Sequence, residues 1–145
     1  MKIEDLSKFG FESNGIRNFT PLETYELCQQ GAVLIDVRED YLSAFKKFSV
    51  PVFFEIPLSQ LETHLSDFNA EDIYIFADSA GIRSKEAVII LMNAGFTNVF
   101  NLAGGIVDWE KANVPLIVDK TEMMSGSCAC QLKYRNINDK KNEII

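Results

Sequence analysis

Short apolar runs alternate with helix-like segments, and this alternation restricts the possible folds more than any other feature of the sequence. The runs are rich in β-branched and aromatic residues and occupy residues 32–37, 52–54, 72–76 and 98–100. The first run is almost continuously apolar, as in a strand that is covered on both faces. Strands separated by helices imply βα crossovers. The pattern therefore predicts an α/β domain with a central, mainly parallel sheet and helices on both faces.

Two helices are predicted, one before the first of these runs and one between the last two. Thr20, Pro21 and Glu23 combine an N-cap residue, a proline at the first helical position and the glutamate of a capping box, so a helix is expected to begin there. We expect it to end at Gly31. A second helix is expected from about Ile82 to Ala94, with Gly95 as its C-cap. Its predicted buried face consists of Ala87, Ile90, Leu91 and Ala94.

The size and composition indicate one soluble globular domain. The chain has 145 residues, of which 47% are hydrophobic and 24% charged. No apolar run reaches the roughly 18 residues that span a bilayer. The first eight residues carry acids and lack an apolar stretch, which is not typical of a secretory signal. We therefore expect no membrane association and a cytoplasmic location, where cysteines are thiols.

Charge is distributed unevenly along the chain. The net charge is −7, which argues against a nucleic-acid-binding surface. Residues 1–118 carry 9 basic and 17 acidic side chains, whereas residues 119–145 carry 5 and 4. Apolar periodicity also fades after Val118. The sequence therefore predicts an N-terminal extension at 1–15, a compact domain at 16–118 and a C-terminal tail at 119–145.

The loop after the strand at residues 73–76 is a candidate anion cradle. It joins this strand directly to the second helix, and it is formed by Asp78, Ser79, Ala80, Gly81, Ile82 and Arg83. Small residues in such a turn let backbone N–H groups point inward, next to the positive end of a helix. The Arg83 guanidinium is suited to close over a bound anion. The alternative is a plain βα connection with an exposed arginine.

At this loop the sequence resembles the rhodanese-like (sulfurtransferase) domain family. Residues Asp78 to Ser84 are similar to the family's active-site loop, Cys-x-x-Gly-x-Arg-Ser. Three more stretches are similar in the right order: Leu34 to Glu39, Ile56 to Leu58, and Gly95 to Trp109 with its Leu-x-Gly-Gly-x-x-x-Trp close. The resemblance covers roughly residues 16–118. It implies a single rhodanese-like α/β domain and, in active members, sulfur transfer through a persulfide on the loop cysteine.

The chain departs from the family where the chemistry takes place, because Asp78 stands in place of the loop cysteine. A carboxylate can accept the same N–H groups but cannot form a persulfide, and its charge repels an anionic sulfur donor. We therefore expect the Asp78 carboxylate to occupy the anion site of its own loop, with Arg83 paired to Asp78. A second departure is Lys47 to Val52, where the family often has Gly-His-Ile-Pro-Gly-Ala. A phosphoryl-accepting role for Asp78 would need further carboxylates, and none stand beside it.

This departure leaves two functional hypotheses. In the first, the domain is a non-catalytic binding or regulatory module whose loop recognises an anionic group or a protein partner. In the second, it is a sulfurtransferase or persulfide carrier that uses Cys128 or Cys130 of the tail, with a sulfur-carrying partner. Ten residues beyond Val118 extend up to about 35 Å, so these thiols can reach the loop. An inert tail and a soft-metal site remain alternatives for the pair.

The remaining candidates receive mostly structural roles. Cys28 is expected to be a small buried hydrophobe, His64 a surface residue, and Trp109 the residue that packs the last helix onto the sheet. The resemblance assigns Asp36 and Arg38 the role of bracing the active loop by charge-assisted hydrogen bonds. No cofactor and no resident metal are expected.

Overall fold

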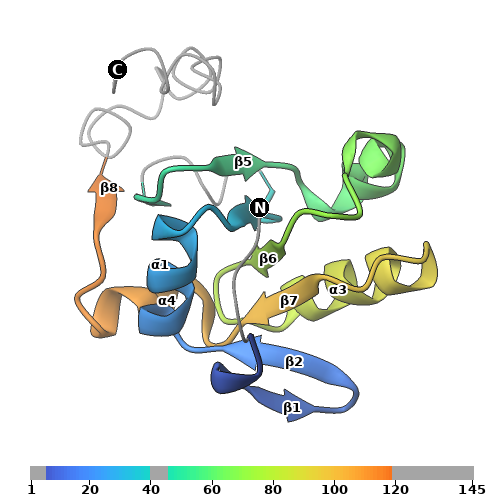
Figure 1. The fold of residues 1–145 in the computed structure, drawn as a ribbon. Coiled ribbons are helices and arrows are strands. Elements are labelled where there is room, and N and C mark those ends of the chain that lie inside the picture. The colour runs from blue at the N-terminus through green and yellow to red at the C-terminus, as the bar shows by residue number, and fades with distance from the viewer. Residues whose placement is uncertain (1–5, 40–45, 119–145) are drawn as a thin grey trace, which may run out of the picture.

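A six-stranded sheet forms the centre of the computed structural model, which describes residues 6–39 and 46–118 (Figure 1). Its strand order is β1-β2-β7-β6-β3-β5. All neighbouring pairs are parallel except β1 with β2. The strands are β1 (Phe11–Ser13), β2 (Ile16–Phe19), β3 (Val33–Asp36), β5 (Phe53–Glu55), β6 (Tyr74–Ala77) and β7 (Val99–Leu102). The expected mainly parallel sheet is therefore confirmed.

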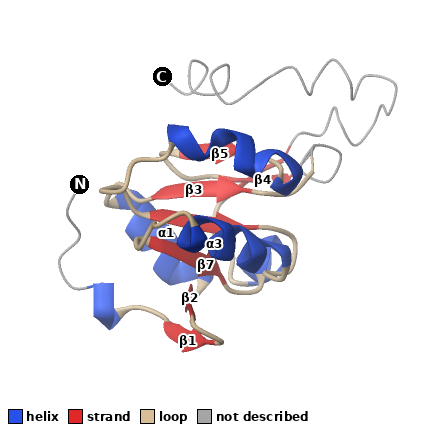
Figure 2. Cartoon of the chain, turned by 90° about the vertical axis from the view of Figure 1, so that its right-hand side faces the viewer, coloured by secondary structure: helices blue, strands red, loops and turns tan. Residues whose placement is uncertain are grey.

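Helices cover both faces of this sheet (Figures 1 and 2). Helices α1 (Pro21–Gln29) and α4 (Gly105–Lys111) contribute to one apolar core. Helix α3 (Arg83–Asn93) and the 3₁₀ helix η2 (Leu58–Asp67) contribute to a second core on the opposite face. A further 3₁₀ turn, η1, spans Leu6–Lys8. This three-layer arrangement is the α/β architecture that the sequence predicts.

A separate two-stranded sheet lies beside α4. Strand β4 (Lys46–Phe48) pairs antiparallel with β8 (Leu116–Val118). The sequence analysis did not predict β4 and β8. It also did not predict β1, β2 and η2. Strand β1 pairs with β2 through a hairpin turn at residues 14 and 15. Part of the expected N-terminal extension therefore adds a strand to the edge of the main sheet.

Helix α1 begins at the predicted capping box. The Glu23 backbone N–H donates to Thr20 Oγ1 at 3.2 Å, and the Thr20 N–H donates back to Glu23 Oε1 at 3.0 Å. The other oxygen of Glu23 accepts the Gly10 N–H at 3.0 Å. The same carboxylate thus caps the helix and holds the segment that leads into β1.

The buried face of α3 differs in part from the prediction. Ala87 and Leu91 are fully buried as expected, and Val88 completes the face. Ile90 is only half-buried and Ala94 is exposed. Because α3 ends at Asn93, Ala94 lies beyond the turn that packs against the sheet.

Trp109 fastens α4 to the first core, as expected. Its ring is fully buried and meets Phe48 edge-on, with the ring centroids 5.0 Å apart. Its Nε1–H donates to the carbonyl of Pro115 at 2.8 Å. The buried indole therefore joins α4 to β4 and to the chain that enters β8.

Within the described ranges, no helix is long and apolar enough to cross a membrane.

Substitution Thr20→Ala tests the capping box. The variant loses the hydroxyl that accepts the Glu23 N–H, so its free energy of unfolding should fall by about 1 kcal/mol. Urea unfolding followed by circular dichroism measures the change. A loss below about 0.3 kcal/mol would contradict a capping role for Thr20.

Candidate functional site

The candidate loop lies at the carboxyl ends of the parallel strands, where open α/β sheets bind their ligands. It follows β6 directly and ends at the first turn of α3. The start of α4 packs against it, because the Ile106 and Val107 N–H groups donate to the carbonyls of Asp78 and Ser79 at 2.9 and 3.1 Å. The structure therefore brings all six predicted loop residues together at one end of the sheet.

The carboxylate of Asp78 fills the inside of this loop. The Asp78 residue is only 4% exposed. Its Oδ1 accepts a hydrogen bond from the Gly81 N–H, and its Oδ2 accepts one from the Arg83 N–H at 2.7 Å. Charge-assisted bonds of this kind offset the cost of burying the carboxylate. The inward-pointing N–H groups of Gly81 and Arg83 are thus already used by the chain's own side chain.

Arg83 binds Asp78 through its backbone alone. Among the described residues, the exposed Arg83 guanidinium has no hydrogen-bond or ion-pair partner. The expected Arg83–Asp78 ion pair is therefore wrong. The physical reason is that the backbone N–H groups already satisfy the carboxylate, so the guanidinium stays in solvent.

A chain of buried polar side chains extends from Asp78 across the sheet. Ser84 Oγ lies 3.4 Å from Asp78 Oδ1 and donates to Asn101 Oδ1. Asn101 Nδ2 in turn donates to Asn18 Oδ1 at 2.8 Å. Ser84, Asn101 and Asn18 are almost completely buried. Their hydrogen bonds link the loop to β7 and β2 and fix its position against the sheet.

Sequence reasoning missed Asn18 and Asn101. A signal was present for Asn101, because it interrupts an otherwise apolar strand, whereas Asn18 follows Arg17 in β2 and gives no such signal. Asn101 stands between Phe100 and Leu102. A buried amide needs a partner, so a polar residue inside such a strand indicates a polar group nearby.

Two glycines permit the close packing of α4 on the loop. Gly81 has φ of +86°, a left-handed conformation, and a Cβ there would lie 2.7 Å from the Gly104 nitrogen. A Cβ on Gly105 would lie 2.4 Å from the Asp78 carbonyl oxygen. Both positions therefore require glycine.

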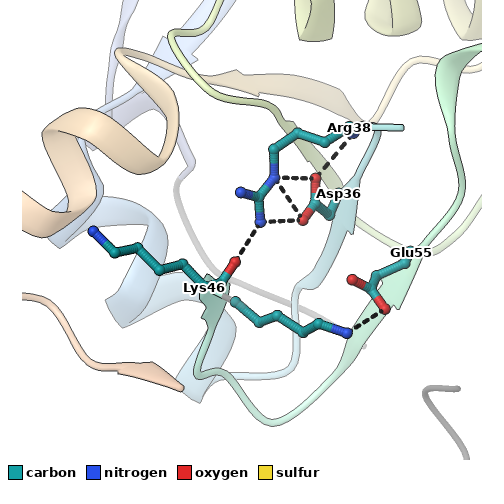
Figure 3. A network of polar contacts seen from close by, with 5 residues as sticks. Asp36, Arg38, Lys46 and Glu55 are labelled. Atoms are coloured by element: carbon teal, nitrogen blue, oxygen red, sulfur yellow. Dashed lines mark hydrogen bonds and ion pairs between the residues drawn. The ribbon is translucent and has the colours of Figure 1, made fainter. Parts of the chain in front are cut away.

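Asp36 and Arg38 form a buried ion pair at the end of β3 (Figure 3). Arg38 Nη2 lies 2.7 Å from Asp36 Oδ2 and also donates to the Lys46 carbonyl at 2.7 Å. Its guanidinium lies 5.6 Å from the centre of the Phe48 ring. These contacts tie β3 to β4. The adjacent Val37 N–H donates to the Ala77 carbonyl at 2.8 Å, which links this corner to the residue before Asp78.

Burial of Asp36 and its pairing with Arg38 act in opposite directions on the pKa of the Asp36 carboxyl. Desolvation raises the pKa of this carboxyl, and the hydrogen bonds and charge of Arg38 act against that rise. A second ion pair, between Lys47 and Glu55, lies next to the first one, with Nζ and Oε1 3.1 Å apart (Figure 3). Lys47 belongs to the stretch that departs from the family's Gly-His-Ile-Pro-Gly-Ala. This departure therefore adds a charge pair beside Asp36.

The remaining sequence candidates lie away from the loop. Cys28 is fully buried in the first core, and burial raises the pKa of its thiol to about 12. The His64 side chain is 42% exposed, and its Nδ1 lies 3.1 Å from Asp67 Oδ2. Both observations agree with the expected structural roles. Cys128 and Cys130 lie outside the described residues.

Substitution Asp78→Asn tests whether the loop depends on the carboxylate. An amide offers one oxygen where two N–H groups converge, so one buried donor loses its partner. The free energy of unfolding should fall by about 1–3 kcal/mol, measured by urea denaturation. Asp67→Asn, at a side chain that is 71% exposed, is the matched control and should change stability by less than about 0.5 kcal/mol. Equal effects of the two substitutions would contradict the proposed hydrogen bonding of Asp78.

The thiol of Cys28 should be unreactive in the folded protein. Its raised pKa leaves almost no thiolate at pH 8, and its burial excludes reagents. In a Cys128→Ser/Cys130→Ser variant, Ellman's reagent should detect no thiol until urea is added. Rapid reaction of the folded variant would show that the first core opens readily.

Comparisons with known proteins agree with the fold. The profile of the rhodanese-like domain family matches residues 20–112. The chain is 30% identical over 101 residues to the thiosulfate sulfurtransferase GlpE of Haemophilus influenzae, covering 69% of this chain and 93% of that protein.

Two solved structures extend this similarity to three dimensions. A rhodanese-related protein from Thermoplasma volcanium superposes with a TM-score of 0.63 at 25% identity, covering 71% of this chain and 99% of that one. The polysulfide-sulfur transferase homodimer of Wolinella succinogenes gives a TM-score of 0.62 at 26% identity, covering 70% and 78%. The chain therefore belongs to the rhodanese-like domain family.

Proposed function

We propose that this protein is a rhodanese-like domain that works as a non-catalytic binding or regulatory module, with loop 78–83 as its contact surface. The observation that carries the proposal is the buried Asp78 carboxylate, bound by the Gly81 and Arg83 N–H groups. It occupies the position at which the family resemblance expects a cysteine.

The chemistry of sulfur transfer explains why this replacement matters. A loop thiolate attacks the outer sulfur of thiosulfate, the sulfur–sulfur bond breaks, and sulfite leaves with the electron pair, so that a persulfide remains on the cysteine. The Asp78 carboxylate cannot hold sulfur as a persulfide. Its negative charge also repels an anionic donor at contact distance. The loop of this chain is therefore expected to be inactive in this step.

The rim of the loop supports a protein as the partner. Two apolar side chains are unusually exposed here, with Ile82 at 70% and Val107 at 46%. Arg83 adds a cation that is not neutralised by any described residue. A free anion would compete with Asp78 for the N–H groups of the loop. A protein surface that offers an apolar side chain next to a carboxylate matches this rim instead.

The alternative function is sulfur transfer or persulfide carriage through Cys128 or Cys130. The names of two relatives favour it, since one is a thiosulfate sulfurtransferase and another a polysulfide-sulfur transferase. In this case a tail thiolate would carry the sulfur for a sulfur-carrying partner. Both versions of the proposal place the protein in the cytoplasm, and its net charge of −7 argues against nucleic acid as the partner.

Restoring the cysteine tests whether the loop lacks only its nucleophile. In the Cys128→Ser/Cys130→Ser background, Asp78→Cys should gain the mass of one sulfur atom when incubated with thiosulfate, and cyanide should remove it. Intact-protein mass spectrometry measures the adduct. Asp78→Ser in the same background is the control and should gain nothing. A folded Asp78→Cys variant that forms no adduct would contradict the expectation that the loop lacks only a cysteine for persulfide formation.

Sulfur loading of the unmodified chain distinguishes the two proposed functions. We expect no sulfur adduct on any cysteine after incubation with thiosulfate or with a persulfide-bearing protein, and no release of thiocyanate with cyanide. Cyanide-sensitive sulfur on Cys128 or Cys130, lost in the double serine variant, would overturn the non-catalytic proposal and establish the alternative.

A further inference from the structure

A pocket of about 550 Å³ opens on the sheet face that carries α3 and η2. It lies between the edge strand β5, its neighbour β3 and the 3₁₀ helix η2, the green helix at the upper right of Figure 1. Pockets for small organic molecules in proteins have volumes of about 300–1,000 Å³. The cavity therefore has the size of a ligand site.

The walls of the pocket are mostly apolar. They are formed by Val33, Ile35, Val52, Phe54, Ile56 and Phe68. Glu55 also borders the pocket. Side chains alternate along a strand, however, so the Glu55 side chain points to the other face of the sheet, where its carboxylate pairs with Lys47. The interior thus offers apolar surface to an occupant, including the aromatic rings of Phe54, Phe68 and Tyr74.

Apart from Glu55, two of the polar residues that line the pocket are acidic, and the others are His64 and Tyr74. Asp67 and Asp72 border it, and no lysine or arginine does so among the described residues. Asp67 lies 3.1 Å from His64, which also lines the pocket. Asp72 Oδ2 accepts the Tyr74 hydroxyl only at 3.5 Å. Each carboxylate therefore has oxygen lone pairs left for a further donor.

This pocket is separate from the Asp78 loop. Asp72 comes before β6 and Asp78 follows it, so the acidic rim and the loop lie at opposite ends of the same strand. A ligand in the pocket therefore has its polar end far from the loop.

We propose that the pocket binds an amphiphilic organic cation, with its apolar body against Phe54 and Phe68 and its ammonium group at Asp67 and Asp72. The apolar walls supply affinity in proportion to the area that is buried. The two carboxylates select positive over negative charge, because they attract a cation and repel an anion. This site is additional to the proposed function of the loop and does not depend on it.

A matched series of probes tests the charge selectivity on the full-length protein. The probes are 4-phenylbutylamine, 4-phenylbutan-1-ol and 4-phenylbutyrate, which share one apolar body and differ in charge. Two-dimensional ¹H–¹⁵N NMR titrations at pH 8 give the affinity and the location of each. We expect saturable shifts at Phe54, Phe68 and their neighbours, with the amine binding about tenfold tighter than the carboxylate.

Two variants separate the pocket from its rim. Val52→Trp fills the cavity from a half-buried wall position and should abolish binding of all three probes. Asp67→Asn should reduce the preference for the amine while leaving the affinity for the alcohol unchanged. Glu26→Gln, at an exposed position of α1 on the opposite face, is the control and should change neither value.

Three results would overturn the proposal. Equal affinity for the three probes would remove the charge selectivity, and shifts scattered over the surface would remove the site. The third result concerns the chain's own C-terminal segment, which carries Lys133 and Arg135. If Lys133→Glu/Arg135→Glu shifts the pocket resonances without any probe, that segment is the occupant instead.

Discussion

A buried carboxylate must find hydrogen-bond donors, and Asp78 obtains them from the loop that it closes. The Gly81 and Arg83 N–H groups converge on its two oxygens, and Ser84 continues the hydrogen bonding to Asn101. The surrounding structure depends on this arrangement. The left-handed conformation of Gly81 turns its N–H inward, and the packing of α4 holds the loop from the other side. A side chain that satisfies the loop from within also leaves its inner N–H groups unavailable to a free anion.

In the proposed function, the residue at position 78 determines which chemistry this loop can perform. A thiolate at this position is held by inward N–H groups and has sulfur chemistry available. In the proposed function, the Asp78 carboxylate receives the same hydrogen bonds but cannot hold a persulfide, and the exposed side chains of Ile82 and Arg83 form the contact surface instead. The charge pairs Asp36–Arg38 and Lys47–Glu55 lie at the neighbouring strand ends, where they hold β3, β4 and β5 together. A shared fold does not by itself establish a shared function.

The sequence predicts the parts of the fold that local chemistry determines. The capping box at Thr20 and the apolar run that forms β3 each carry their own signal, and the structure confirms both. Strands β4 and β8 have three residues each, and only their pairing across the chain defines them. The prediction that Ala94 belongs to the buried face of α3 was wrong, because the helix ends one residue earlier, at Asn93. Within the site, Asp78 was identified by motif, whereas Asn18 and Asn101 become partners only when distant strands meet.

Titration of the loop amides with thiosulfate tests the central claim most directly. In the unmodified protein, the ¹H–¹⁵N resonances of Gly81 and Arg83 should stay unchanged, because the Asp78 carboxylate already occupies these N–H groups. In an Asp78→Ala variant the same resonances should shift and saturate as the anion enters the vacated loop. Saturable shifts of Gly81 and Arg83 in the unmodified protein would contradict the account, since they would place an external anion where the Asp78 side chain is claimed to lie.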